Sequence, residues 1–420
     1  MTNKSQTAAD CCDDYDPNSL SAEAAAQRIR QAARPVPEIE GVAVRAALGR
    51  VVARDVASPV DVPNHTNSAM DGYALKGSDL PADGEAELAV IGTSWAGRPF
   101  DGEVNAGECV RIMTGAVMAN GTDTVVMQEH VERIGDTLRI GAGQKTGQHV
   151  RHAGEDLAAG AIAIQKGRRL TPADLGLAAS LGISELPVTR KPRVAFFSNG
   201  DELRSVGQPL EIGELYDSNR YTLYGMLSRA EVDMVDLGVV PDDPDALRKV
   251  FQDAARCADV VITSAGASVG DADYVNDILK ELGEVDFWKI AIKPGRPLAF
   301  GKIGDSLFFG LPGNPVSAMV TFYIFVLPVL RYMMGESETQ PLQLRARCET
   351  RLKKRPGRME YQRGVLGTKD GELVVNSTGW QGSGILSSMS LANSFIILPV
   401  DSEGVKPGDM VDVQPFAGII

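Results

Sequence analysis

Cysteine, positive charge and long apolar runs are scarce in this chain of 420 residues. Its five cysteines form no CxxC pair, and the adjacent Cys11 and Cys12 lack the spacing of a metal-binding clip, so we expect reduced thiols and a cytoplasmic protein. The first residues are polar and acidic, whereas a secretory signal needs a basic start and an apolar stretch. The most apolar run, residues 318–330, is shorter than the roughly 20 residues that span a bilayer. We therefore predict a buried helix there and no membrane anchor.

The charge balance excludes some classes of protein. The chain has 42 lysines and arginines against 55 aspartates and glutamates, which gives a net charge of −13. Such an acidic chain is not expected to coat nucleic acid or an anionic membrane, so any anionic ligand has to be bound locally. The hydrophobic fraction of 44% is that of an ordinary globular protein, and the length predicts about three domains.

Changes in the hydrophobic period divide the chain into a tail and four parts. After a disordered tail (1–18), we predict an elongated helical and β linker lobe from 19–58 and 152–190, and a β-rich lobe at 59–151. Residues 191–338 alternate apolar strands with helices, which predicts a mostly parallel sheet covered on both faces. Strand and turn patterns in 339–420 predict a small β-barrel. The fold class is therefore mixed α/β, with several domains around a three-layer α/β domain.

Ligand-binding residues are expected beyond the carboxyl ends of the parallel strands. Glu202, Asp242 and Asp273 each follow a strand, and carboxylates with few other ligands suit a partly hydrated Mg²⁺ that contacts phosphate. Capping of a helix or turn remains an alternative for Asp242 and Asp273. Gly266 and Gly270 would let the backbone approach an anion at a helix start, although a plain strand-to-helix turn is equally compatible.

Basic residues occur in two segments. Lys289 and Lys293 lie four residues apart on an expected strand, with Arg296 just beyond, so both lysines would point to one face and clamp an anion. A solvated strand edge and an anion site are equally compatible with the densest basic stretch, which contains Arg351, Lys353, Lys354, Arg355 and Arg358. In the β-rich region, a structural turn is the favoured interpretation of an Asp-Gly pair such as Asp71-Gly72. Taken singly, each of the following residues is a weak signal of function: Asp71, Thr114, Arg151, Glu155 and Asp156.

Taken in order, the motifs closely resemble those of the MoeA/gephyrin family of molybdopterin molybdotransferases. The resemblance extends from about residue 20 to residue 416, and the α/β domain would then be MogA-like. The motifs are NSAMDGYA (67–74), RIMTGA (111–116), RHAGED (151–156), NGDEL (199–203), PDDP (241–244), SVGDADY (268–274), IKPGRP (292–297), GLPGNPVSA (310–318), RMEYQRG (358–364) and QGSGIL (381–386).

The resemblance implies an Mg²⁺-dependent enzyme that inserts molybdenum from molybdate into adenylylated molybdopterin and releases AMP. It also implies an elongated homodimer, in which the α/β domain of one subunit and the β-rich lobe of the other form a shared cleft. By matching position, the implied catalytic residues are Asp71, Thr114, Arg151, Asp156, Lys289, Lys293 and Ser383, and the implied metal ligands are Glu202, Asp242 and Asp273. The implied substrate-binding residues are Gly266, Ser268, Gly270, Arg296, Pro312 and Pro315.

Two departures from the family pattern and two alternative functions stay open. Ala265 and Ala267 stand where relatives often carry adjacent glycines, so they would narrow the approach of the nucleotide phosphates, and Ser198-Asn199 stands where Thr-Gly is frequent. One alternative is a scaffold of the gephyrin E-domain type, against which the full set of site residues argues. The other is the preceding adenylyl transfer, against which the extra β domains argue. Expected partners are the molybdopterin adenylyltransferase and the enzymes that accept the cofactor.

Overall fold

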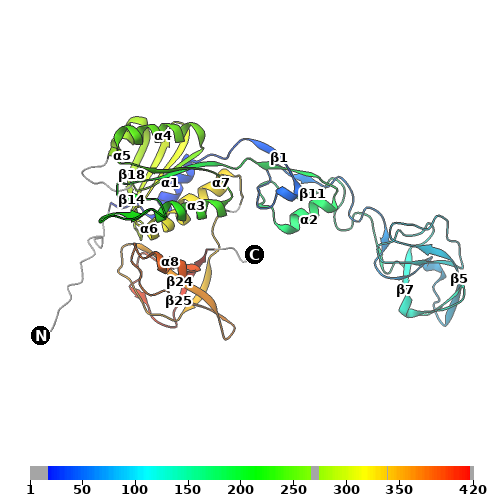
Figure 1. Ribbon diagram of the computed structural model, residues 1–420. Helices are drawn as coiled ribbons and strands as arrows, with labels where there is room; N and C mark the ends of the chain where they lie inside the picture. Colours follow the sequence, from blue (N-terminus) through cyan, green and yellow to red (C-terminus); the bar gives the residue numbers. More distant parts are fainter. Residues whose placement is uncertain (1–17, 266–273, 338, 417–420) are drawn as a thin grey trace.

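The computed structural model describes residues 18–265, 274–337 and 339–416. They form an elongated molecule in four parts (Figure 1). An α/β domain and the C-terminal barrel are stacked at one end, a narrow linker lobe follows, and a β-rich lobe lies at the other end. The tail predicted for residues 1–18 lies almost wholly outside the described residues.

A six-stranded sheet organises the α/β domain. Along β13 (Arg193–Asn199), Val194 and Phe196 belong to the core on one face of the sheet, and Ala195 and Phe197 belong to the core on the other. This burial on both faces explains the unbroken apolar run and confirms the three-layer domain with a mostly parallel sheet. The strand order is β16 (Asp233–Val240), β13, β17 (Val260–Ser264), β21 (Ser306–Leu311), β20 (Pro297–Ile303) and β18 (Gly283–Lys289). The first four strands in this order are parallel to one another. β20 and β18 are each antiparallel to their neighbours.

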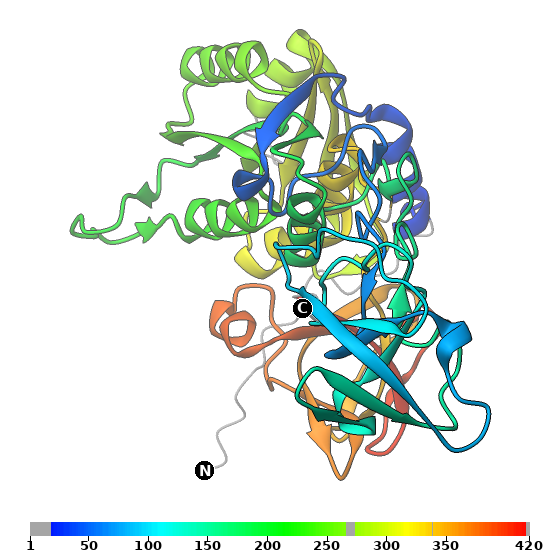
Figure 2. The same cartoon turned by 90° about the vertical axis from the view of Figure 1, so that its right-hand side faces the viewer.

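Helices cover both faces of this sheet (Figure 1). α4 (Pro244–Cys257) and α5 (Tyr274–Leu282) pack on one face. The opposite face is covered by α1 (Ala22–Ala32), α3 (Ser218–Ala230), α6 (Pro315–Thr321) and α7 (Leu327–Met333). Between β13 and α3, the short strands β14 (Leu203–Arg204) and β15 (Leu215–Tyr216) form a ribbon that projects from the domain (Figure 2).

The first helix differs from its predicted place. We assigned residues 19–58 to the linker lobe, but Ala22, Ala25 and Ile29 are buried in the core of the α/β domain. The Leu20 backbone N–H also donates to the carbonyl oxygen of Lys289 (2.8 Å), at the end of β18. An amphipathic pattern identifies the buried face of a helix but not the domain that covers that face.

The apolar segment Pro315–Met333 is one helix, with a π-helical turn, η4 (Phe322–Val326), in its middle. Its length and composition would suit a membrane span, but 61% of its most apolar window is buried inside the molecule. Val316, Phe325 and Leu330 belong to the core of the α/β domain. The segment is therefore a core helix, as its apolar run predicted.

The linker lobe consists of two chain segments that run side by side. β1 (Ile39–Ala43) pairs with β12 (Glu185–Thr189), and β2 (Val56–Ala57) pairs with β11 (Ile162–Ile164). α2 (Pro172–Ser180) begins with a capping box, in which Thr171 and Asp174 each accept a hydrogen bond from the other's backbone N–H. A 3₁₀ turn, η1 (Val44–Ala46), completes the lobe.

The β-rich lobe contains a second six-stranded sheet and a separate strand pair. The strand order of the sheet is β7 (Thr124–Met127), β4 (Gly72–Leu75), β6 (Glu108–Ile112), β5 (Glu85–Ser94), β9 (Thr137–Gly141) and β8 (Val131–Ile134). β3 (Asn67–Ser68) pairs with β10 (Val150–Arg151). The short helical turns η2 (Gly77–Asp79) and η3 (Gln128–His130) connect strands in this lobe.

The C-terminal domain is a closed barrel, as predicted. Pairing of β24 with β26 closes the strand series β24 (Met359–Lys369), β25 (Glu372–Ser377), β22 (Leu344–Cys348), β28 (Met410–Pro415) and β26 (Ser394–Leu398). β23 (Leu352–Lys353) pairs with β27 (Gly404–Val405), and α8 (Leu386–Leu391) lies beside α6. β19 (Ile292–Lys293) from the α/β segment adds to β24, so the two domains share a sheet edge.

Candidate active site

Polar side chains are linked by hydrogen bonds at the carboxyl ends of β13, β16 and β17. Asn199 donates from Nδ2 to Asp242 Oδ1 (3.1 Å) and accepts at Oδ1 from Thr263 Oγ1 (3.2 Å). Asp201 Oδ1 accepts the backbone N–H of Asp242 (3.1 Å). The cap of α4 is Asp243 rather than Asp242, because the Asp243 side chain accepts the N–H in the first turn of α4. The Asp242 carboxylate therefore keeps acceptor capacity for a ligand at this edge.

Buried polar residues support this edge from below. The Ser198 hydroxyl donates to Asp217 Oδ1 (3.0 Å) and lies 3.2 Å from Ser264 Oγ. Ser198 and Asn199 are both buried. The Ser-Asn pair that departs from the family pattern is thus accommodated by hydrogen bonds to neighbouring strands and to the start of α3.

The described residues include two of the three predicted metal ligands. Glu202 and Asp242 are exposed just beyond the ends of β13 and β16, whereas Asp273 lies outside the described residues. Within the ranges that the structure describes, no group of three or more His, Cys, Asp or Glu side chains could hold a metal ion. Glu202 and Asp242 nevertheless offer only oxygen donors, which fits the preference of Mg²⁺.

The loop after β17 starts in an unusual backbone conformation. Ala265 has a φ of 89°, a left-handed value that glycine adopts far more easily. Its N–H donates to the carbonyl oxygen of Leu311 (3.1 Å), which ties the loop to the end of β21. The predicted substrate-binding residues Gly266, Ser268 and Gly270, like Ala267, lie outside the described residues.

Our prediction that Lys289 and Lys293 share one strand face is wrong. β18 ends at Lys289, and Lys293 belongs to β19, which joins the sheet of the barrel. The chain turns between them, where the Ile290 N–H donates to the carbonyl oxygen of Arg296 (2.7 Å). Lys289 is exposed, whereas Lys293 and Arg296 are half-buried. The two lysines therefore belong to different strands in different sheets.

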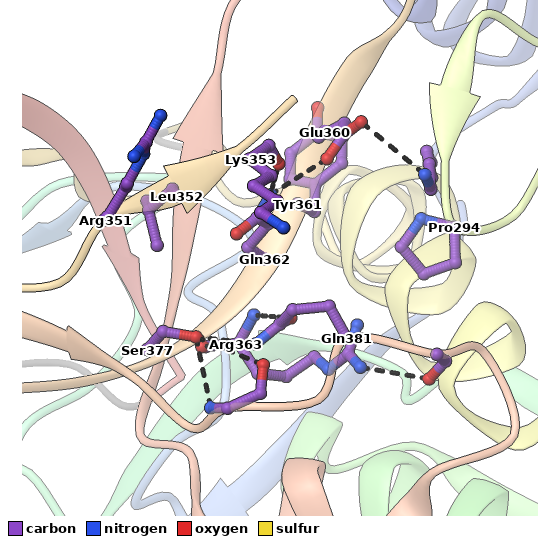
Figure 3. Close-up of a pocket in the computed structure, with 13 residues that line it drawn as sticks. Pro294, Arg351, Leu352, Lys353, Glu360, Tyr361, Gln362, Arg363, Ser377 and Gln381 are labelled. Carbon is purple, nitrogen blue, oxygen red and sulfur yellow. Dashed lines mark hydrogen bonds and ion pairs between the residues drawn. The ribbon is translucent and has the colours of Figure 1, made fainter. Parts of the chain in front are cut away.

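A cavity of about 370 Å³ lies where the α/β domain meets the barrel (Figure 3). Lys293 Nζ lies 3.8 Å from Glu360 Oε1, and Glu360 Oε2 accepts from Gln362 Nε2 (2.9 Å). Four basic side chains and one acidic side chain line the wall, so the cavity is positively charged within an acidic chain. The lining residues are Lys293, Pro294, Arg351, Leu352, Lys353, Glu360, Tyr361, Gln362, Arg363, Ser377, Gly379, Gln381 and Gly382.

The sequence did not lead us to Arg363, the buried basic residue of this cavity. Its side chain is 0% exposed, and burial lowers the pKa of the guanidinium to about 10. Nε donates to Ser388 Oγ (3.0 Å), and Nη2 donates to the carbonyl oxygens of Trp380 (3.3 Å) and Gly382 (3.0 Å). Among the described residues no acidic side chain pairs with it, so no salt bridge neutralises its charge. The available signal was a single arginine within the strand motif RMEYQRG.

The loop that carries Ser383 is anchored on both domains. Gln381 pairs with the backbone of Arg363, accepting its N–H at Oε1 (2.7 Å) and donating from Nε2 to its carbonyl oxygen (3.2 Å). The carbonyl oxygen of Ser383 accepts the N–H of Val316 (3.1 Å) in the first turn of α6. Pro315 starts that helix, and buried Pro312 precedes it. The structure therefore brings the segments of Pro312, Pro315 and Ser383 together at the domain junction.

Of the four remaining predicted residues, Asp71, Thr114 and Arg151 belong to the β-rich lobe, which lies at the other end of the molecule from the cavity (Figure 1), and Asp156 follows just after it. Asp71 Oδ1 accepts the backbone N–H and the hydroxyl of Thr114, both at 2.7 Å, and these bonds hold the pKa of the Asp71 carboxyl below its usual value. Arg151 ends β10 and lies 3.9 Å from Glu155, and Asp156 is exposed. Within one chain, these residues are not brought to the cavity.

Comparison with known proteins covers almost the whole chain. Residues 20–182 match the MoeA N-terminal region (domain I and II), residues 195–332 a probable molybdopterin binding domain, and residues 345–416 the MoeA C-terminal region (domain IV). A molybdopterin molybdenumtransferase from Haemophilus influenzae is 43% identical over 91% of this chain and 95% of its own length. Gephyrin from Dictyostelium discoideum is 34% identical over 89% of this chain and 59% of its own length.

A solved structure has the same architecture. The molybdopterin biosynthesis moeA protein from Pyrococcus horikoshii aligns with a TM-score of 0.84 and 28% identity. The alignment covers 95% of this chain and 100% of that one. The similarity therefore includes the arrangement of all four parts.

Proposed function

Because the chain belongs to the MoeA family and is a molybdopterin molybdenumtransferase of molybdenum cofactor biosynthesis, we propose that it inserts molybdenum from molybdate into adenylylated molybdopterin and releases AMP. The observation that carries this detail is the positively charged cavity between the α/β domain and the barrel. Its buried Arg363 has no acidic partner among the described residues, although the chain as a whole is acidic. Oxyanions such as molybdate and phosphate are ligands of the matching charge and hydrogen-bonding capacity.

We propose that Mg²⁺ takes part at the adjoining sheet edge. Glu202, Asp242 and Asp273 would hold the ion, and their oxygen donors suit it. When bound, it would neutralise phosphate charge and orient the adenylate. Lys293 and Arg363 would attract and position the oxyanion, and the hydrogen-bonded Asn199 keeps the Asp242 carboxylate oriented toward the edge. No side-chain nucleophile is needed.

A turnover assay tests this function. Purified enzyme receives adenylylated molybdopterin, molybdate and Mg²⁺, and AMP release is measured together with reconstitution of a cofactor-free molybdoenzyme. We expect Lys293→Ala and Asp242→Asn to slow AMP release, while Lys302→Ala, an exposed lysine on β20, serves as the matched control. Absence of AMP release from the wild-type enzyme would refute the proposal.

We further propose that the enzyme is a homodimer with shared clefts. The distance between the β-rich lobe and the cavity in one chain supports an arrangement in which Asp71, Thr114, Arg151 and Asp156 face the cavity of the partner (Figure 1). Lys289 would contribute from the exposed end of β18. We also propose that the protein is cytoplasmic and acts between the adenylyltransferase that would supply its substrate and the enzymes that would accept the cofactor.

Subunit mixing distinguishes shared from separate clefts. If Asp71→Asn and Lys293→Ala are each inactive as homodimers, a mixed dimer with shared clefts contains one cleft in which both residues are wild type. Random mixing at equal concentration would then restore about a quarter of wild-type activity, because half of the dimers are mixed and each has one intact cleft. No recovery, or a monomer in sedimentation at micromolar concentration, would contradict the shared cleft.

A further inference from the structure

The basic stretch at residues 351–355 contains residues of two kinds. Leu352 and Lys354 are buried, whereas Arg351 and Lys353 are exposed, which is the alternation of a strand. The Lys354 ammonium donates to three backbone carbonyl oxygens at 3.1 to 3.2 Å, so Lys354 is a structural residue. Arg351 and Lys353 line the cavity instead.

In the part of the chain that the structure describes, no carboxylate pairs with these two side chains. The residue opposite Lys353 on β27 is Gly404, which has no side chain to offer. Glu360, the acidic residue of the cavity wall, is already engaged by Lys293 and Gln362. Over residues 18–265, 274–337 and 339–416, the structure gives no hydrogen bond or ion pair to the side-chain nitrogens of Arg351 or Lys353.

The position of the two residues places positive charge on a second side of the cavity. Figure 3 shows Arg351 at one side of the cavity, Lys353 in the middle beside Glu360 and Tyr361, and Pro294, the neighbour of Lys293, at the other side. Like charges on one strand face repel each other, and an anion between them removes that repulsion. The cavity of about 370 Å³ falls in the range that holds small-molecule ligands, with room for more than one oxyanion group.

We propose that Arg351 and Lys353 form a second oxyanion subsite of this cavity, distinct from the one at Lys293 and Arg363. The subsite would take a tetrahedral oxyanion, supplied either by molybdate or by the phosphate of adenylylated molybdopterin. The inference rests on the proposed function, since that function supplies both anions. The proposal gives Arg351 and Lys353 a role in anion binding. From the sequence alone, the basic stretch was equally compatible with an anion site and with a solvated strand edge.

Direct binding measurements test the subsite. Calorimetric titrations with sodium molybdate, and separately with AMP plus Mg²⁺, would compare wild type with Arg351→Ala/Lys353→Ala. The control is Lys249→Ala/Lys302→Ala, which removes the same charge from exposed positions on α4 and β20. We expect the test variant to bind at least one probe about 5- to 30-fold more weakly, and more so at low salt, because each exposed cation contributes modestly to anion binding.

The outcomes separate the subsite from the function. Weaker binding of molybdate alone assigns the subsite to molybdate, and weaker binding of AMP alone assigns it to the phosphate. Recovery of affinity in Arg351→Lys/Lys353→Arg would support a requirement for charge. If wild-type enzyme releases AMP normally and the test variant binds both probes as tightly as the control, the subsite is wrong and the function stands.

Discussion

Replacement of Arg363 by methionine is the most direct perturbation of the cavity. The substitution removes the guanidinium but keeps a long unbranched side chain inside the barrel wall. The guanidinium donates to Ser388 Oγ and to the carbonyl oxygens of Trp380 and Gly382, and these acceptors belong to the segment that includes Ser383. Arg363→Met therefore removes a positive charge and the anchor of a loop together.

The cost to stability is the difference between two opposing terms. Three hydrogen bonds from a charged donor, at about 1.5–3 kcal/mol each, contribute about 4.5–9 kcal/mol. Burial of the charge costs about 3 kcal/mol, the free energy that corresponds to a fall in the Arg363 pKa from 12.5 to about 10. The free energy of unfolding should therefore fall by about 1.5–6 kcal/mol. An oxyanion that hydrogen-bonds the guanidinium would lose about 2–4 kcal/mol, which weakens its binding about 30- to 1,000-fold.

The assay separates these two effects. Urea unfolding at pH 7 measures the change in stability, and titration with molybdate measures binding to the folded variant. The control is Arg345→Met, since Arg345 lies on the same barrel, is 62% exposed and pairs with Asp412 at 3.3 Å. We expect the control to change the free energy of unfolding by less than about 0.5 kcal/mol and to leave molybdate binding intact.

Two results would refute this reasoning. Molybdate and AMP affinities within twofold of wild type in folded Arg363→Met would show that the buried guanidinium does not meet the ligand. A loss of stability well above the expected range would show that the hydrogen bonds contribute more free energy, or burial of the charge costs less, than this reasoning assigns to them. Arg363→Lys keeps the charge without the planar fork, so its binding should be intermediate.

Three further substitutions follow from local contacts. Thr114→Val should raise the pKa of the Asp71 carboxyl toward 3.8, which NMR titration of the carboxyl group would measure; an unmoved pKa would contradict this prediction. The pKa of Asp71 is lower in the folded state than in the unfolded state. The stabilisation by the hydrogen bonds from Thr114 is therefore present above the unfolded-state pKa and is lost as the pH falls through the folded-state pKa. Ala265→Gly should raise the free energy of unfolding by about 0.5–1 kcal/mol, since glycine relieves the positive φ; a destabilised variant in urea would count against this. Lys354→Met should destabilise the barrel by about 2–4 kcal/mol, because three carbonyl oxygens lose their donor, without weakening molybdate binding to the folded protein; weaker binding would argue against a structural role.

The α/β domain was predictable because its strands are buried on both faces. Four consecutive apolar residues, 194–197, divide between two cores, as expected for a strand of a parallel sheet that is covered on both faces. The predicted helix start at Asp243-Pro244 was equally local, since capping depends on neighbouring residues. The partner of α1 was not predictable, because the covering surface comes from residues about 170–300 positions away in the chain.

The candidate site was predictable only where topology determines it. Asn199, Asp201 and Asp242 meet because parallel strands end at one edge, and the sequence shows where each strand ends. The two lysines were misjudged, because the turn at Ile290 moves Lys293 into the sheet of another domain. That transfer depends on pairing between β19 and β24, which the pattern of either segment alone does not reveal.

The cavity acquires positive charge mainly by lacking carboxylates rather than by accumulating lysine. Elsewhere in this acidic chain, Arg169, Arg190 and Arg220 each pair with at least one carboxylate within 3.2 Å, which leaves little charge for a ligand. In the cavity, Arg363 is held by a hydroxyl and two carbonyl oxygens, neutral acceptors that position the guanidinium without cancelling its charge. Glu360 lies 3.8 Å from Lys293, but it is one acidic residue among four basic residues, so the wall of the cavity keeps an excess of positive charge. An acidic protein can thus bind oxyanions at one place, because burial and neutral hydrogen bonds preserve there the charge that salt bridges neutralise elsewhere.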